Sequence, residues 1–195
     1  MIKKIITLFF LICVISACLP MLDYYYYPLA ELGEVRQSVG VNKNKGPYDT
    51  ILFQADYGVK IRVAMAPGAG SRIDMFMNIP QGVQVKFRDN LFTAKDLLSG
   101  KMIDKKVDTL YYYERKQKIE KDFSSILEGD TELFRSFNSI MRVDRQYYIY
   151  IEWKELNFES FKLRCPGLAI NGKEYNIPEV TFTKKSGFFV YPIAG

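Results

Sequence analysis

The 195-residue chain contains no histidine at all. Histidine is the usual general base near neutral pH and a frequent zinc ligand, so its absence excludes Ser-His-Asp and Cys-His catalysis and histidine-ligated zinc. An enzyme with this sequence would depend on carboxylates, lysine, tyrosine or serine alone. We therefore expect a protein that is not an enzyme and that has no catalytic residues, no metal and no cofactor.

The chain also lacks a long apolar run. A helix that spans a bilayer needs ~20 apolar residues, whereas the largely apolar segment from Ile5 to Ala17 is only thirteen residues long, includes Thr7 and Ser16, and follows Lys3 and Lys4. A charged start, a short apolar centre and small residues at its end are typical of a secretory signal. We predict that residues 1–17 are a signal peptide.

The end of this segment carries a recognisable junction. Ile15-Ser16-Ala17-Cys18 resembles the lipobox of bacterial lipoproteins. The resemblance implies cleavage just before Cys18 and lipidation of that residue, with a diacylglycerol on its sulfur and a fatty acyl chain such as palmitate on its amine. Several acyl chains on one residue satisfy the requirement for stable membrane anchoring. The alternatives are a signal peptide cut elsewhere, which would release a soluble protein, and an uncleaved anchor.

The residue that follows Cys18 bears on localisation. An Asp there would resemble the signal that retains lipoproteins in the inner membrane, and this chain has Leu19 instead. The resemblance therefore implies a protein held in the cell envelope by its N-terminal lipid. We expect it in the outer membrane, facing the periplasm.

Removal of residues 1–17 changes the composition of the mature chain. It leaves 178 residues, which is enough for one domain. Its 25 basic and 22 acidic side chains give a net charge of +3, too small to predict a nucleic-acid partner. Because Cys13 leaves with the signal and Cys18 is acylated, Cys165 has no partner for an intramolecular disulfide. Cys165 falls on the apolar face of its predicted strand, so we expect a buried, inert thiol.

The segment 18–47 is predicted to be the lipidated N-terminus followed by a tether. It contains "YYYYP" at 24–28 and the polar "NKNKGP" at 42–47. The tyrosines either lie among lipid headgroups, where aromatic rings with polar tips are favoured, or pack on the domain. The stretch 34–41 is a candidate edge strand. A single folded domain is predicted over residues 48–195.

Most of this domain alternates between apolar and polar residues. Alternation over four to eight residues, bounded by Gly, Pro and Asn, marks half-buried strands. The expected inward positions are Ile51, Phe53, Ala55 and Tyr57, then Val59, Ile61, Val63 and Met65, then Ile73, Met75, Met77 and Ile79, then Val83, Val85 and Phe87, then Tyr147, Ile149, Ile151 and Trp153, and then Phe161, Leu163 and Cys165. We predict roughly nine antiparallel strands in a mainly β domain, a β-sandwich of immunoglobulin-like or similar type.

The period changes to a helical one within about 114–142. Ile119, Phe123, Ile126 and Leu127 fall at i, i+4, i+7 and i+8, Gly129 stands where a helix would end, and Asp130 where the next would be capped. The same spacing continues through Leu133, Phe134, Phe137, Ile140 and Met141. We predict a helix pair inserted between strands, which either packs on the sandwich or binds a partner.

Basic residues form the first candidate binding surface. Three predicted strands each carry two cations, spaced by two residues, which places both on one face of the strand. The six cations are Lys60, Arg62, Lys86, Arg88, Lys162 and Arg164. If the three strands lie in one sheet, these cations would attract an anionic partner such as a lipid phosphate or an acidic protein. Alternatively, they keep exposed strands soluble and prevent association between sheets.

Two tyrosines form the second candidate. Tyr148 and Tyr150 lie on the outward face of "YYIYIEWKE" and could stack on sugars or lipid, although aromatic residues are also common in strands. The acids Glu152, Glu155 and Glu159 could in principle supply the carboxylate pair of a glycosidase. We interpret these acids as exposed residues of a strand and a turn.

The sequence therefore favours a lipid-anchored envelope module that acts by non-covalent recognition of a protein or anionic envelope partner, without nucleic acid. The alternatives are an immunity-like protein against a periplasmic toxin, a structural accessory of an envelope or secretion assembly, and an envelope hydrolase that uses carboxylates. A fixed stoichiometric partner would indicate the accessory. A cleft with two acids of raised pKa would indicate the hydrolase.

Overall fold

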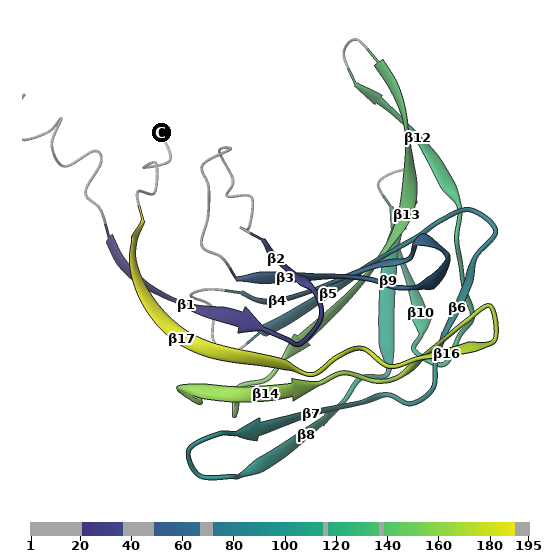
Figure 1. Ribbon diagram of the computed structural model, residues 1–195. Helices are drawn as coiled ribbons and strands as arrows, with labels where there is room; N and C mark the ends of the chain where they lie inside the picture. Colours follow the sequence, from purple (N-terminus) through teal and green to yellow (C-terminus); the bar gives the residue numbers. More distant parts are fainter. Residues whose placement is uncertain (1–20, 37–48, 67–71, 115–116, 137–138, 190–195) are drawn as a thin grey trace, which may run out of the picture.

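The described part of the protein is built almost entirely from antiparallel strands. The computed structural model describes residues 21–36, 49–66, 72–114, 117–136 and 139–189. These residues form three antiparallel sheets and one short 3₁₀ helix, η1 (Asp56–Gly58) (Figure 1). The mainly β, antiparallel architecture predicted from the alternation is confirmed.

The largest sheet has eight strands. Its order is β10 (Gln117–Asp122), β9 (Thr109–Glu114), β13 (Ser139–Glu152), β5 (Arg72–Ile79), β4 (Lys60–Ala66), β3 (Thr50–Gln54) and β2 (Glu34–Arg36), with β12 (Thr131–Ser136) paired to β13. The part of β13 before Arg145 pairs only with β12. These two strands form an arm that projects beyond the rest of the sheet in Figure 1.

The chain crosses three times between the two smaller sheets. The five-stranded sheet has the order β1 (Met21–Leu29), β17 (Val180–Phe189), β14 (Ser160–Arg164), β7 (Leu91–Asp96) and β8 (Met102–Lys106). The four-stranded sheet has the order β11 (Leu127–Glu128), β6 (Gln84–Phe87), β15 (Leu168–Ile170) and β16 (Lys173–Tyr175). The chain passes between these two sheets from β6 to β7, from β14 to β15 and from β16 to β17.

One apolar core joins the inner faces of all three sheets. In β5, Ile73, Met75 and Met77 are fully buried on the inward face, as the period of two predicts. Trp153 and Tyr147 are among the largest fully buried side chains. Burial of this apolar surface is the dominant stabilising contribution to the fold.

Tyr57 is an exception among the expected inward residues, because it is 55% exposed. The strand β3 ends at Gln54, and the chain then turns through η1. Tyr57 has a φ of 56°, in the left-handed region that ends the alternation of a strand. The next inward residue, Val59, is again buried.

The predicted helix pair is wrong, because this part of the chain forms β10, β11, β12 and the start of β13. The prediction depended on apolar residues spaced by four, seven and eight positions, and the spacings of four and eight also place side chains on one face of a strand. Ile119 in β10 is half-buried and Phe123 is buried, whereas Ile126, which a helix would turn inward, is 50% exposed. Pairing with β9 and β13 determines the structure of this region.

The predicted tether also contains strands. Within 18–47, β1 pairs along its whole length with β17, and β2 pairs with β3. Tyr26 contributes to this docking, since its ring meets that of Phe161 edge-on at 5.7 Å and its hydroxyl donates to the Phe158 carbonyl oxygen at 2.9 Å. At least this tyrosine therefore packs on the domain. The polar stretch 42–47 lies outside the described residues.

Candidate functional site

The outer face of the eight-stranded sheet carries a group of aromatic side chains. Strand side chains alternate between faces, so the neighbours of buried core residues point outward here. The group, called the aromatic face below, consists of Phe76 on β5, Tyr111 and Tyr113 on β9, and Tyr148 and Tyr150 on β13. It combines residues from three strands that are adjacent in the sheet.

Cross-strand register brings these rings together. Tyr148 lies opposite Tyr111 on one side and opposite Phe76 on the other. The rings of Tyr148 and Tyr111 stack, with centroids 5.5 Å apart and planes 11° apart. The ring of Phe76 meets that of Tyr148 edge-on at 5.5 Å, and the ring of Tyr150 lies 5.1 Å from that of Tyr111. Both geometries are favourable for aromatic pairs.

The aromatic face has a buried centre and exposed margins. Tyr111 is only 8% exposed, although it lies outside the apolar core. Tyr113 and Tyr150 are 45% and 41% exposed. Such a surface presents aromatic area to a ligand without a large loss of side-chain entropy, because the rings already hold one another in place.

Cations border the aromatic face. The guanidinium of Arg62 lies 5.4 Å from the centroid of Phe76, and the ammonium of Lys118 lies 4.3 Å from that of Tyr111. Both are cation–π contacts. Lys118 also forms an ion pair with Glu120 at 3.0 Å, whereas Arg62 has no carboxylate partner among the described residues.

A third border is the pair formed by Arg72 and Asp74 on β5. The guanidinium donates from Nε and an Nη to both carboxylate oxygens, at 2.7 and 2.9 Å, and lies 5.1 Å from the centroid of Tyr150. Burial raises the pKa of Asp74, and the hydrogen bonds from Arg72 only partly oppose this. Burial, followed by the nearby Asp74, raises the pKa of the Tyr150 hydroxyl. The hydroxyl of Tyr150 is thus a neutral hydrogen-bonding group near neutral pH.

Amide groups complete one side of the site. The hydroxyl of Tyr148 donates to Gln146 Oε1 at 2.8 Å, and Gln146 Nε2 donates to Asn78 Oδ1 at 3.1 Å. The chain Tyr148–Gln146–Asn78 crosses from β13 to β5 and orients the Tyr148 ring. The arrangement supports stacking, cation–π contacts and hydrogen bonding, which are the elements of non-covalent recognition.

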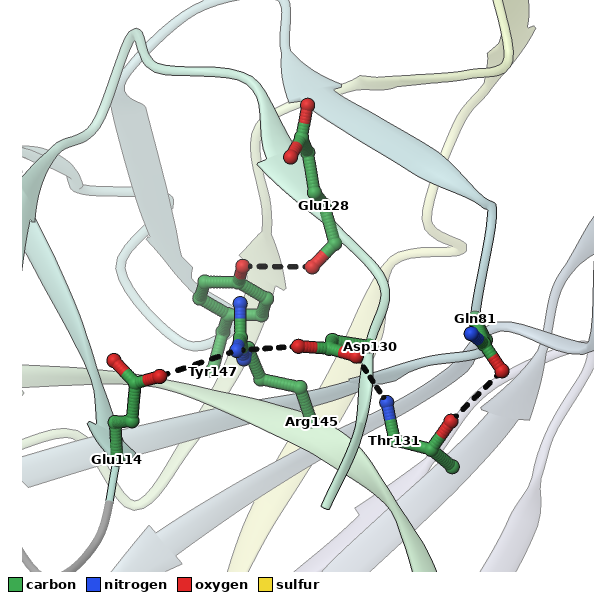
Figure 2. Close-up of polar contacts among 7 residues, drawn as sticks. All are labelled: Gln81, Glu114, Glu128, Asp130, Thr131, Arg145 and Tyr147. Carbon is green, nitrogen blue, oxygen red and sulfur yellow. Dashed lines mark hydrogen bonds and ion pairs between the residues drawn. The ribbon is translucent and has the colours of Figure 1, made fainter.

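A polar cluster at the base of the β12–β13 arm lies next to this sheet (Figure 2). Arg145 forms ion pairs with Asp130 at 2.7 Å and Glu114 at 3.9 Å, and its guanidinium lies 4.8 Å from the ring centroid of Tyr112. The backbone N–H of Arg145 donates to the Asp130 carbonyl oxygen at 2.8 Å. Burial raises the pKa of the Tyr147 hydroxyl, which donates to the carbonyl oxygen of residue 128 at 2.9 Å. These contacts hold the arm to the sheet.

The six predicted cations do not form one surface. Lys60 and Arg62 lie on β4 in the eight-stranded sheet, Lys86 on β6 in the four-stranded sheet, and Lys162 on β14 in the five-stranded sheet. The condition of a single shared sheet is therefore not met. The sequence could not reveal this, because strand order depends on contacts between distant segments.

Of the six cations, Arg88 follows β6, and Lys162 and Arg164 lie on β14. Arg88 forms an ion pair with Glu174 at 2.9 Å, and Lys162 lies 3.9 Å from Glu179. Arg164 is exposed at the end of β14. These placements fit the alternative reading, in which cations keep exposed strands soluble.

The two predicted tyrosines are brought together with three aromatic residues that sequence reasoning missed. Phe76 alternates with the buried Met75 and Met77, which is a signal that it points outward. Tyr111 and Tyr113 carried no such signal, because "LYYY" contains no polar residue that identifies the outward positions. In β9 it is Tyr112 that joins the core.

The three acids considered for a carboxylate pair are exposed, as expected for residues of a strand and a turn, and they have different neighbours. Glu159 forms an ion pair with Lys184 at 3.0 Å, Glu152 ends β13 opposite Arg72, and Glu155 is exposed. Within the described ranges, no three acidic or cysteine side chains lie close enough to bind a metal ion. The described residues also contain no helix that is long and apolar enough to cross a membrane. Cys18 lies outside the described residues.

Comparison with known protein families, with curated proteins and with solved structures finds no match for this chain.

Proposed function

We propose that this protein is a lipid-anchored envelope module that binds another protein non-covalently, and that the aromatic face is its binding surface. The single observation that supports the surface is the convergence of five aromatic rings and Arg62 on the exposed side of one sheet. Tyrosine and arginine are the residues that contribute most to binding energy at protein interfaces. We retain the predicted β-sandwich as the scaffold of this surface, and the antiparallel sheets around one apolar core support it.

A protein partner accounts for both parts of the surface. The exposed edges of Tyr113 and Tyr150 offer apolar area with a polar tip, which suits the centre of an interface. Arg62, which lacks a carboxylate partner in the described part of the chain, favours a partner with an acidic group. A toxin neutralised in the periplasm or a subunit of an envelope assembly would both meet this description.

Photo-crosslinking in the native cells tests the proposal. p-Benzoylphenylalanine at position 113 or 150 is expected to yield a discrete protein adduct. The matched control is position 57, because Tyr57 is an exposed tyrosine on η1, outside the aromatic face. Adducts at all three positions alike would contradict the proposed surface, and an adduct removed by glycosidases rather than proteases would indicate a glycan ligand instead.

Charge reversal tests the contribution of Arg62. Arg62→Glu is expected to weaken capture of the crosslinked partner by about tenfold or more, the effect of a hot-spot residue. Lys86→Glu is the matched control, since Lys86 is an exposed cation without a carboxylate partner in the described residues, but it lies in another sheet. Equal effects of the two variants would show that net charge, not the aromatic face, governs binding.

A further inference from the structure

The hairpin that joins β7 and β8 presents apolar side chains at its end. Leu98 is 79% exposed and Leu97 44%, and Met102 at the start of β8 is 61% exposed. These three residues are called the leucine tip below. Single exposed apolar residues are common on protein surfaces, but three on one short hairpin form a patch that needs an explanation.

The backbone of the leucine tip is held in a defined shape. The carboxylate of Asp96 accepts hydrogen bonds from the N–H of Leu98 at 3.2 Å and of Ser99 at 3.1 Å, and also from the Ser99 hydroxyl. The N–H of Gly100 donates to the Asp96 carbonyl oxygen at 3.0 Å, and Gly100 has a φ of 72°. These hydrogen bonds fix the turn in a shape that leaves both leucines exposed to solvent.

The leucine tip lies at the same end of the five-stranded sheet as the start of β1. Tyr27 lies opposite Thr183, Thr183 lies opposite Ser160, and the Ser160 carbonyl oxygen accepts from the Leu97 N–H at 3.0 Å. Beyond this row β1 runs back toward Met21, its first residue. In Figure 1 the β7–β8 turn and the start of β1 both lie on the left side of the protein.

This end of the sheet is therefore the end at which the predicted lipid is attached. Cys18 precedes Met21 by three residues, and an extended chain covers at most ~3.6 Å per residue, so the two lie within about 11 Å. Two strands separate β1 from β7, an offset of about 14 Å across the sheet at ~4.8 Å per strand, and the six residues from Tyr27 to Met21 carry the start of β1 about 20 Å beyond the row that holds Leu97. A bilayer that holds the acyl chains of Cys18 and lies obliquely against this end of the sheet therefore reaches the leucine tip as a second, separate contact.

The charges at this end suit an anionic lipid surface. Lys95 and Lys101 flank the leucine tip, and Lys185 lies on β17 with its ammonium 4.2 Å from the ring centroid of Tyr27. None of the three lysines has a carboxylate partner among the described residues. Lysine and tyrosine are residues that settle at the membrane–water interface, and each basic residue near an anionic leaflet adds attraction.

We infer that this end of the five-stranded sheet rests on the membrane, with the leucine tip inserted into the lipid interface beside the acyl anchor. The inference rests on the proposed lipidation of Cys18 and goes beyond it, because acyl chains on one residue attach the domain without orienting it. A second contact, some distance from the first, restricts the rotation of the domain. The surface presented to partners is then constant.

A fluorophore at the tip tests this inference in the full, lipidated chain. Leu98→Cys is purified from cells, labelled with the environment-sensitive dye NBD, and reconstituted in vesicles of phosphatidylcholine and phosphatidylglycerol in equal parts. Leu32→Cys is the matched control, since Leu32 is a 66% exposed leucine beyond the opposite end of β1. Cys165 is buried and does not compete for the dye.

We expect a blue-shifted emission and quenching by bromine-labelled lipid at position 98, and neither at position 32. Lys95→Glu together with Lys101→Glu is expected to reduce the quenching at position 98, as is vesicle lipid without phosphatidylglycerol. Emission at position 98 that matches position 32 and resists quenching would overturn the inference. The mass of the same purified protein reports acylation of Cys18 separately, so a failure of the anchor is distinguishable from a failure of the tip.

Discussion

The ring of Tyr148 stacks on the ring of Tyr111, with planes only 11° apart, across two strands of a sheet face that lies outside the apolar core. The two residues are far apart in the sequence and meet because β13 pairs with β9. Phe76 lies on the other side of Tyr148, so one row of the sheet carries three consecutive rings. A stack of this kind stabilises the sheet and at the same time presents its exposed margins to a partner.

The buried centre of the aromatic face is expected to contribute more to stability than its margins. Tyr111→Ala should lower the free energy of unfolding by about 3 kcal/mol, since it leaves a cavity beneath the neighbouring rings. Tyr113→Ala is the matched control and should cost less than about 1.5 kcal/mol, because Tyr113 is 45% exposed. Urea unfolding followed by fluorescence measures both, and equal losses would show that Tyr111 is not enclosed as described.

Gly129 is expected to tolerate no side chain. A Cβ at this position would lie 1.8 Å from the carbonyl oxygen of Pro80, a backbone atom that cannot move aside easily. Gly129→Ala should therefore prevent native folding or lower the melting temperature strongly. Gly82→Ala is the control, because its φ of 79° is unfavourable for alanine but its surroundings are open, so the cost should be only about 1–2 kcal/mol. Similar melting temperatures for the two variants would contradict this packing.

The ion pairs of Arg145 are expected to stabilise the base of the β12–β13 arm. Its side chain is only 14% exposed, and Arg145→Met should cost about 1.5–3 kcal/mol through loss of the charged hydrogen bond to Asp130. Arg88→Met is the comparison, because its pair with Glu174 is exposed and should contribute less than about 1 kcal/mol. Chemical denaturation of both variants provides the measurement. A larger loss of unfolding free energy for Arg88→Met than for Arg145→Met would contradict the stabilising role given to the Arg145–Asp130 pair.

Cys165 is expected to be inert in the folded protein. It is buried, and burial raises the pKa of its thiol to about 12. The raised pKa means that the thiol favours folding below its unfolded pKa of ~8.5 and that this contribution is lost as the pH rises toward 12. A maleimide should thus label Cys165 in urea but not in buffer at neutral pH. Fast labelling of the native protein would mean that the Cys165 side chain faces solvent rather than the core.

Acylation is expected to depend on Cys18 alone. Cys18→Ser should abolish incorporation of labelled fatty acid, because the lipobox resemblance assigns the diacylglycerol to that sulfur. Cys13→Ser is the matched control and should retain full acylation, since Cys13 lies within the predicted signal peptide. Mass spectrometry of the purified chains distinguishes the two, and fatty acid on the Cys18→Ser protein would refute the predicted anchor.

The inward faces of most strands were predictable from the sequence. Alternation between faces is a local property of an extended chain, so Ile73, Met75 and Met77 could be assigned to the core without knowledge of their partners. The same reasoning predicted the burial of Cys165 and the outward position of Tyr148. Each of these expectations depends only on neighbours within one strand.

Other features were decided by tertiary structure, because they depend on which distant segments pair. The region 114–142 has apolar spacings that suit a helix or a strand, and pairing of β10 with β9 and of β12 with β13 selects strands. The six cations were separated because β4, β6 and β14 belong to three sheets. The pairing of β13 with β9 brings Tyr148 next to Tyr111, and the pairing of β1 with β17 places the start of β1 at the end of the sheet that carries Leu98. No local pattern in the sequence encodes this order of strands.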